Sequence, residues 1–402
     1  MLSPYSWMTR LGSLSTPRMV ALIAFFGQLY FFVPVMTPYL QAKGLNLAQI
    51  AGLQTMLMVS MLAMEIPTGV LADRLGHRRS YQISMAMAAL GELITLLADT
   101  YPEFLIGQFV AGAGFAFASG SVDALVYESL PKTNRTLGMQ KARGMIGAAM
   151  QAASLVAYSV GGWLTRELTF ENMRLTLKLD VVFVGFAAVL ALLLREPTRE
   201  VVAERLRSLD LLKSGWNTIR ESSHLKRLMV LNIATNAFVP HLLIFYQEYF
   251  LISSVAPIWL GLGLALGSGV AFFTQLHAWR LSGWLGDRNA MLVATGVPGV
   301  LYLLMALVTN PVLAVVLFIV QWGMVQIAIP LFSGLYNEHI AEESRATTLS
   351  LVSGVVTIYI SLGGIVLGWL AGISLSLMFA SLGVIIIVGA HLIRPLPNDQ
   401  SA

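Results

Sequence analysis

Four side chains that can exchange a proton lie inside long apolar stretches of this sequence: Glu65, Glu92, Asp123 and His241. Ionisable groups at membrane depth are costly and usually face a polar interior or a pathway, and burial favours the neutral form of a carboxyl group. Each is therefore a candidate for coupling proton movement to another process. A hydrogen-bonded structural role is the alternative. We favour that role for Glu65 and Asp123, near the cytoplasmic ends of their stretches, and keep both readings open for Glu92 and His241.

Long apolar segments must hold these groups. Of the 402 residues, 56% are hydrophobic and 11% are charged, against about 25% charged in soluble domains, so too little polar surface is present to cover a soluble fold. A membrane-spanning helix needs about 20 apolar residues. Twelve segments qualify: 19–41, 46–72, 80–99, 102–129, 142–165, 176–194, 227–251, 255–282, 290–309, 311–336, 346–371 and 374–393. Their length favours helices over barrel strands, which predicts an all-α membrane protein with twelve transmembrane helices.

The basic residues predict the orientation, because Lys and Arg concentrate in the cytoplasmic loops of membrane proteins. With the N-terminus in the cytoplasm, 21 of the 25 Lys and Arg residues lie on that side. Only Lys43, Arg166, Arg174 and Lys178 lie outside. We therefore expect a multi-pass protein of the cell (inner) membrane with both termini cytoplasmic. The net charge of +4 then follows from this placement, and no nucleic-acid partner is expected.

One long polar connection divides the spans into six and six. Residues 195–226 mix charged side chains with Val and Leu, a pattern typical of an amphipathic helix on the membrane surface. The predicted domains are an N-terminal six-helix bundle over 1–194, a cytoplasmic amphipathic linker over 195–226 and a C-terminal six-helix bundle over 227–402.

The two halves contain matching motifs. Gly-x-x-x-Asp-Arg occurs as Gly69–Arg74 after span 2 and as Gly283–Arg288 after span 8, 214 residues apart. Pro34 and Pro240 are 206 residues apart. Four further pairs are 210 residues apart: Leu125 and Leu335, Glu128 and Glu338, Arg135 and Arg345, and Gly144 and Gly354. Six spans separate the partners, so both lie on the same side of the membrane. Parallel repeats of this kind are associated with transporters whose substrate site lies between the halves.

The loop after span 2 carries a family resemblance. Gly69-Val-Leu-Ala-Asp73-Arg74-Leu-Gly76-His77-Arg78-Arg79 resembles the signature loop of the major facilitator superfamily, and the six-plus-six layout extends the resemblance over nearly the whole chain. It implies the major facilitator fold. The segments 65–69, 123–130 and 345–350 resemble a bacterial drug-efflux-like branch. Two motifs differ from it: Gln108 stands four residues before Gly112 where an arginine is common, and Gly161-Gly162 lacks the preceding Gly-Pro.

The resemblance implies a cytoplasmic gate. Gly69 and Gly283 would let helices approach closely, and Asp73 would sit against the N-terminus of span 11. Arg74 would pair with Glu128 or Asp123. Arg288 would pair with Glu338, and Gly76, Arg78, Asp287 and Arg345 complete the predicted gate. We expect the pairs to hold the outward-open state and to break on the inward swing. The alternative is that they only fix the loop topology.

The resemblance also implies that spans 1, 4, 7 and 10 line a central cavity. The candidate lining residues share amide or aromatic side chains and lack fixed charge: Gln28, Tyr30, Phe31, Gln108, Phe115, Asn232, Asn236, Gln321 and Gln326. Such a lining suits an amphipathic or weakly polar solute. Helix packing is the alternative role for each residue. The expected partners are a small-molecule substrate, a proton or sodium ion and membrane lipid, with the protein acting as a monomer.

The absence of several sequence motifs narrows the classes of function that the protein can have. The sequence has no cysteine and no Gly-x-x-x-x-Gly-Lys-Ser/Thr, His-Glu-x-x-His or Gly-x-Ser-x-Gly motif. We therefore expect no cofactor, no metal site and no enzyme activity. The leading prediction is a secondary transporter that works by alternating access as a proton-coupled efflux antiporter. Proton- or sodium-coupled symport and lysolipid transport are alternatives, and a membrane-embedded enzyme is the alternative outside the transporter class.

Overall fold

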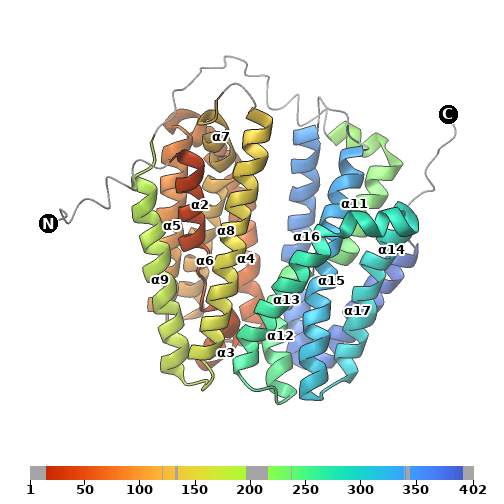
Figure 1. The fold of residues 1–402 in the computed structure, drawn as a ribbon. Coiled ribbons are helices and arrows are strands. Elements are labelled where there is room, and N and C mark those ends of the chain that lie inside the picture. Colours follow the sequence, from red (N-terminus) through yellow and green to blue (C-terminus); the bar gives the residue numbers. More distant parts are fainter. Residues whose placement is uncertain are drawn as a thin grey trace, which may run out of the picture. The chain divides into compact units, whose positions relative to one another are not determined.

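The computed structural model describes residues 15–119, 121–131, 135–195, 216–236, 238–338, 340 and 345–392 (Figure 1). Within these residues every regular element is a helix. Ten of the described helical segments are long and apolar enough to cross a membrane, and two shorter apolar helices lie where spans 1 and 12 are predicted. The all-α, multi-span fold is therefore confirmed.

Contacts within the chain divide it into two compact units. Unit 1 comprises Met1–Leu45 and Met56–Val202, and unit 2 comprises Asn46–Thr55 and Ala203–Ala402. The boundary after Val202 falls inside the predicted linker. Residues 196–215 of that linker lie outside the described part of the chain, so the amphipathic helix stays a prediction.

Unit 1 holds the first six spans, except that the start of span 2, residues 46–55, groups with unit 2. Its described elements are α2 (Thr16–Gly27), η1 (Val33–Val35), α3 (Met36–Ala42), α4 (Leu47–Leu75), α5 (His77–Leu97), α6 (Tyr101–Ala118), α7 (Ser121–Glu128), α8 (Arg135–Leu164) and α9 (Phe170–Leu192). Glycines let α4, α5 and α6 pack closely. A Cβ atom on Gly112 would lie 2.4 Å from the carbonyl oxygen of Leu57, and one on Gly107 would lie 2.8 Å from Oγ1 of Thr95. Such small-residue contacts replace the hydrophobic driving force that lipid removes.

Unit 2 holds spans 7 to 12. Its elements are α11 (Ser223–Asn236), α12 (Val239–Ile252), α13 (Ile258–Leu276), α14 (Ala278–Leu307), α15 (Pro311–Glu338), α16 (Arg345–Ile373) and α17 (Leu375–Leu392). The helix α14 contains a turn at Gly286 (φ 75°, ψ 156°), so span 9 begins only after it. Aromatic rings pack together where α12 meets α15. Tyr246 stacks on Phe318 with 4.3 Å between ring centroids, and Phe250 meets Phe318 edge-on at 5.3 Å.

The internal repeat is visible in the helix ends. Helices α5 and α14 end at Leu97 and Leu307, α6 and α15 begin at Tyr101 and Pro311, and α8 and α16 begin at Arg135 and Arg345, each pair 210 residues apart. The left-handed backbone positions repeat at the same spacing, at Gly44 and Ser254 and at Gly76 and Gly286. A positive φ is rare outside glycine, so these matched turns support one structural register.

This register corrects the motif alignment. Gly76 (φ 91°, ψ 153°) and Gly286 adopt nearly the same backbone conformation, which sets the spacing at 210 residues rather than 214. Asp73-Arg74 therefore precedes the turn glycine of the first half, whereas Asp287-Arg288 follows that of the second. The two Asp-Arg pairs are not structural equivalents. In the same register Gly69 corresponds to Trp279.

Candidate functional site

Span 1 is broken in its middle, although one helix was predicted over 19–41. Helix α2 ends at Gly27, η1 begins at Val33, and the backbone between them is not helical. Pro34 contributes to the break because it has no N–H to donate to the carbonyl oxygen of Tyr30, four residues before it, and its ring crowds that group. Backbone groups outside a helix need other partners at membrane depth. The break therefore requires an acceptor from elsewhere in the bundle.

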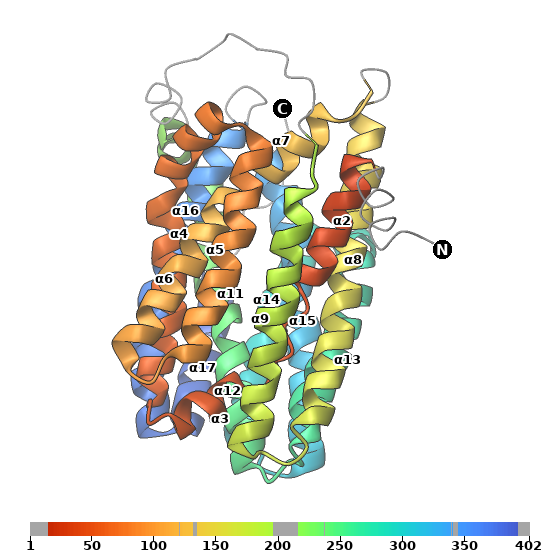
Figure 2. The same cartoon turned by 90° about the vertical axis from the view of Figure 1, so that its left-hand side faces the viewer.

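Asp180, on α9, provides this acceptor. The N–H of Phe31 donates to its Oδ1 at 2.7 Å and the N–H of Phe32 to its Oδ2 at 3.3 Å. The aspartate is 1% exposed. Figure 2 shows α9 beside α2 and the stretch that follows it. On the opposite side of the break, α8 presents Gly161, where a Cβ atom would lie 2.3 Å from the carbonyl oxygen of Phe31.

A second carboxylate and two phenols lie near Asp180. Glu92, on α5, is half-buried and close enough to interact electrostatically with Asp180. Tyr30, in the break, interacts with both carboxylates and with Tyr158 of α8, and Tyr158 interacts with Asp180. We call these four residues the carboxylate cluster. Among the described residues, no cation acts on Asp180.

Glu92 and Tyr30 are among the residues predicted from the sequence, whereas Asp180 is not. The signal was present, because Asp180 lies in the apolar segment 176–194. Such a carboxylate is as unusual there as Glu92 is in span 3. The hydrogen bonds to the break could not be anticipated, because a hydropathy profile does not reveal that span 1 is broken.

The other predicted coupling residues lie in different surroundings. Glu65 is exposed on α4, and Asp123 forms an ion pair with Arg143. His241 is 1% exposed and packs on α16. A Cβ atom on Gly364 would lie 2.1 Å from Nε2 of His241. Gly364, which has no side chain, thus leaves the space that the imidazole occupies. Within unit 1, Glu65 and Asp123 do not lie beside Glu92.

The ion pairs at the predicted cytoplasmic end differ from the predicted ones. Glu128 lies 3.3 Å from Nε2 of His77, and Asp123 pairs with Arg143. The predicted partner Arg74 is exposed on α4. The reason is the turn at Gly76, which places His77 at the start of α5. The gate side chains of Asp73, Asp287, Glu338 and Arg345 lie outside the described residues, and so does that of Asn236.

The expected role of two gate glycines stays a prediction. No atom of the described structure lies within 4 Å of a Cβ atom added to Gly69 or to Gly283. Within their own units these glycines therefore do not mediate a close helix contact. Gly76 has a different use, since its positive φ is a conformation that glycine adopts freely. Arg78 follows it in the first turn of α5, and Arg288 is exposed at the start of span 9.

The predicted cavity residues divide by burial. Phe31 is 5% exposed and packs against Phe183, with 5.5 Å between ring centroids, so it is a core residue rather than a lining one. Gln321 is fully buried within unit 2, and Nδ2 of Asn232 donates to the hydroxyl of Tyr336 at 3.4 Å. The remaining side chains are half-buried or exposed in their own units: Gln28, Tyr30, Gln108, Phe115 and Gln326.

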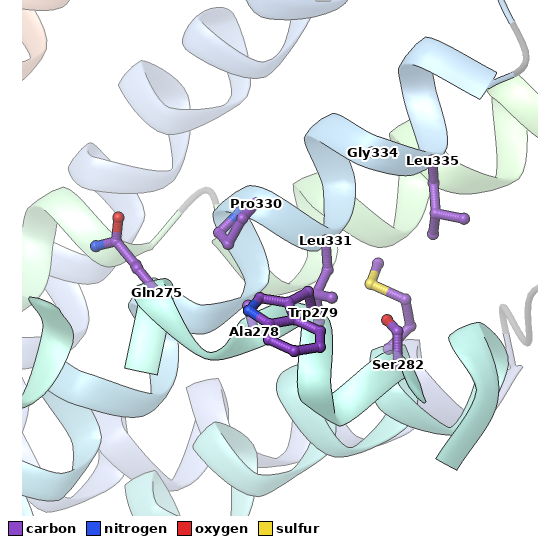
Figure 3. A pocket seen from close by; sticks show the side chains of 9 residues that line it. Gln275, Ala278, Trp279, Ser282, Pro330, Leu331, Gly334 and Leu335 are labelled. Carbon is purple, nitrogen blue, oxygen red and sulfur yellow. The ribbon is translucent and has the colours of Figure 1, made fainter. Parts of the chain in front are cut away.

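Unit 2 contains a cavity of about 410 Å³ that was not predicted from the sequence (Figure 3). It lies between the junction of α13 and α14 and the C-terminal half of α15. Its walls are mostly apolar and consist of Gln275, Ala278, Trp279, Ser282, Met291, Pro330, Leu331, Gly334 and Leu335. This volume is typical of small-molecule pockets, which span roughly 300–1,000 Å³.

At the end of unit 1 opposite the His77–Glu128 and Asp123–Arg143 pairs, an ion pair joins three parts of the chain. Lys43 follows α3 and pairs with Asp99, which lies between α5 and α6. The ammonium group also lies 5.5 Å from the centroid of the Phe170 ring at the start of α9. The hydrogen bond from Lys43, and then its charge, hold the pKa of the Asp99 carboxyl below its usual range.

We predict that Asp99→Asn lowers the melting temperature slightly at pH 7. Because the pKa is lowered by folding, the ion pair stabilises the protein above the unfolded-state pKa of about 3.9 and ceases to do so as pH falls below it. The difference in melting temperature between wild type and Asp99→Asn should therefore shrink below about pH 4. Thermal unfolding of the purified protein across pH tests this. A difference that stays constant with pH would contradict it.

Comparisons with known proteins agree with the fold. A family model described as "Major Facilitator Superfamily" matches residues 19–364. The nucleoside transporter NupG has the same fold, with a TM-score of 0.77 over 96% of this chain and 100% of that chain at 13% identity. A bacterial homolog of the human lysosomal transporter Spinster gives a TM-score of 0.75 over 98% of this chain and 97% of that chain at 16% identity. At these identities the likeness concerns the fold alone.

Curated relatives match only segments of the chain. The uncharacterized MFS-type transporter YfiU of Bacillus subtilis is 31% identical over 106 residues, which are 26% of this chain and 19% of that protein. The inner membrane transport protein YajR of Escherichia coli is 27% identical over 39% of this chain and 32% of that protein. The drug efflux pump JefA of Mycobacterium tuberculosis is 28% identical over 29% and 23%, respectively. The chain thus spans less than a third of the length of each of these relatives. The family model, in contrast, covers most of the chain, which therefore belongs to the Major Facilitator Superfamily of secondary transporters.

Proposed function

We propose that this transporter exports an amphipathic or weakly polar organic solute in exchange for protons. The observation that carries the coupling is the carboxylate cluster at the break of span 1. Asp180 is buried with two backbone donors, and Glu92 lies beside it. Discontinuous transmembrane helices are common binding sites for coupling ions in transporters.

The chemistry of the cluster favours a proton. Two carboxylates that interact in a buried site are costly to charge at the same time, so such pairs tend to share a proton. The titratable groups that face Asp180 are Glu92 from α5, Tyr30 from the break and Tyr158 from α8. None of them is basic. The cluster can therefore gain and lose one proton as its access to water changes.

The nature of the solute rests on the predicted lining and on one relative. The half-buried amides of Gln108 and Gln326 and the exposed ring of Phe115 suit a solute that is partly apolar. The segment shared with the drug efflux pump JefA favours export. Symport would use the same cluster with solute and proton moving together. Sodium-coupled transport and lysolipid transport stay open beside it.

Orientation and gating complete the proposal. Both termini are cytoplasmic in this scheme, as the 21 of 25 basic residues on that side favour. We propose that the Asp123–Arg143 and Glu128–His77 pairs form part of the cytoplasmic gate and break during alternating access. Asp73, Arg345 and the second-half residues Asp287 and Glu338 stay candidates for the same gate.

Transport in proteoliposomes tests the coupling. We predict that an imposed pH gradient drives accumulation of ethidium, a fluorescent amphipathic cation, and that Glu92→Gln abolishes this accumulation while leaving downhill exchange. Glu171→Gln is the matched control, because this exposed carboxylate at the start of α9 lies outside both the cluster and the proposed gate. Accumulation by Glu92→Gln equal to wild type would contradict the assignment. Accumulation of ethidium driven by a sodium gradient in place of the pH gradient would favour sodium coupling.

A further inference from the structure

The helix of span 8 is interrupted at a position where its counterpart in the first half is continuous. Helix α4 continues through Pro67 to Leu75, whereas α13 ends at Leu276 and α14 starts at Ala278. His277 lies at the bend, with φ −106° and ψ 7°. Its ring Nδ1 lies 2.9 Å from the carbonyl oxygen of Phe273, a local contact that competes with the helical hydrogen bond. Figure 1 shows the start of α14 running across the neighbouring helices of unit 2 before the chain turns.

The segment between the bend and Gly286 resembles a membrane-interface anchor. Trp279 is 68% exposed and Trp284 is 81% exposed. The guanidinium group of Arg280 lies 5.3 Å from the centroid of the Trp279 ring, within the range of a cation–π contact. Tryptophan and arginine are characteristic of the headgroup region on the cytoplasmic side of a membrane, which is the side that the predicted orientation gives to this segment.

The 410 Å³ cavity lies directly under this segment. The Trp279 ring forms one wall, and Pro330 and Leu331 of α15 form the facing wall (Figure 3). The only polar side chains in the lining are Gln275 and Ser282, and neither forms a hydrogen bond within the described part of the chain. The site thus combines a hydrocarbon-like interior with two polar groups and an arginine stacked on its wall.

We propose that this cavity binds one acyl chain of an anionic phospholipid from the cytoplasmic leaflet, with Arg280 holding the phosphate. The apolar walls exclude a polar solute and match hydrocarbon. The guanidinium group suits a phosphate oxygen pair and draws an anionic headgroup. The first half has no equivalent, since Gly69 stands where the second half has Trp279. The site is therefore a property of unit 2 and does not depend on the proposed substrate.

Lipid-dependent thermal unfolding of the purified full chain in detergent tests the proposal. The probes are dioleoyl phosphatidylglycerol, dioleoyl phosphatidylcholine and glycerol 3-phosphate. Two variants address the two parts of the site. Arg280→Gln removes the phosphate ligand. Gly334→Leu adds a side chain to the wall of the cavity, where a Cβ atom would have no other atom within 4 Å.

Matched controls exist for both variants. Arg79 is exposed at the cytoplasmic end of unit 1, so Arg79→Gln removes one positive charge elsewhere. Gly372 is exposed near the C-terminal end of α16 and also has open space around it. Gly372→Leu therefore adds the same side chain away from the cavity. Both controls should respond to lipid as the wild type does.

We expect phosphatidylglycerol to raise the melting temperature at about tenfold lower concentration than phosphatidylcholine, as one charge-assisted hydrogen bond permits. Arg280→Gln should abolish this preference, and Gly334→Leu should remove the stabilisation by both lipids. Glycerol 3-phosphate should have no effect. The proposal would be overturned if phosphatidylglycerol raised the melting temperature of all variants equally. It would also be overturned if glycerol 3-phosphate raised the melting temperature as much as phosphatidylglycerol does. Stabilisation by ethidium that Gly334→Leu removes, while that by phosphatidylglycerol persists, would assign the cavity to the transported solute instead.

Discussion

Asp180→Ala is expected to lower the free energy of unfolding by roughly 2–6 kcal/mol, since two buried N–H groups lose their acceptor at about 1–3 kcal/mol each. The donors are the backbone N–H groups of Phe31 and Phe32. In the apolar interior of unit 1 they have no water to replace the carboxylate. Unfolding of the purified protein in mixed micelles measures the loss.

Asp180→Asn separates the structural role from the proposed proton site. The amide oxygen can still accept one of the two hydrogen bonds, so the loss of stability should be smaller than for alanine. The amide cannot exchange a proton, so transport driven by a pH gradient should be lost. Glu171→Gln, at the exposed start of the same helix, is the control and should change neither quantity. An Asp180→Asn protein that keeps pH-driven transport would leave Asp180 a structural residue only.

The helical spans could be predicted from the sequence because hydrophobicity is a property of whole segments. Each of the twelve apolar segments contains a described helix. The interruptions of these helices could not be predicted in the same way. The break after Gly27 and the bend at His277 leave the mean hydropathy of spans 1 and 8 almost unchanged. They depend on where a few backbone N–H and C=O groups find partners, which only the packed bundle determines.

The gate shows a second limit, which concerns register. The motif Gly-x-x-x-Asp-Arg aligns Gly69 with Gly283 by residue identity. The backbone instead aligns Gly76 with Gly286, because both must adopt a positive φ where one span turns into the next. Here a shared backbone conformation identifies the equivalent positions of the two halves better than a matching residue pattern does. The corrected register also shows where the halves differ: Arg74 corresponds to Trp284 and Asp73 to Gly283, whereas Arg78 corresponds to Arg288.

Gly161→Ala is expected to destabilise the protein by about 1–3 kcal/mol, the usual cost of forcing an extra group into a packed interior. The added Cβ atom would lie 2.3 Å from the carbonyl oxygen of Phe31. That oxygen cannot easily move, because the N–H of Phe31 is bonded to Asp180 and its ring packs on Phe183. Gly147, on the same helix, has open space around it. Gly147→Ala should instead stabilise the helix by about 0.5–1 kcal/mol.

The two variants at the break should also be coupled. Gly161 and Asp180 hold opposite sides of the Phe31 peptide unit, so a change in one alters what the other contacts. Neighbouring sites of this kind show interaction energies of about 0.5–3 kcal/mol in double-mutant cycles. We expect Gly161→Ala combined with Asp180→Asn to cost less than the two single changes together, because a break that has lost one hydrogen bond can shift away from the methyl group. If the two energy costs are strictly additive, the backbone at the break adjusts to Gly161→Ala in the same way whether or not Asp180 holds it. The two residues would then hold span 1 independently.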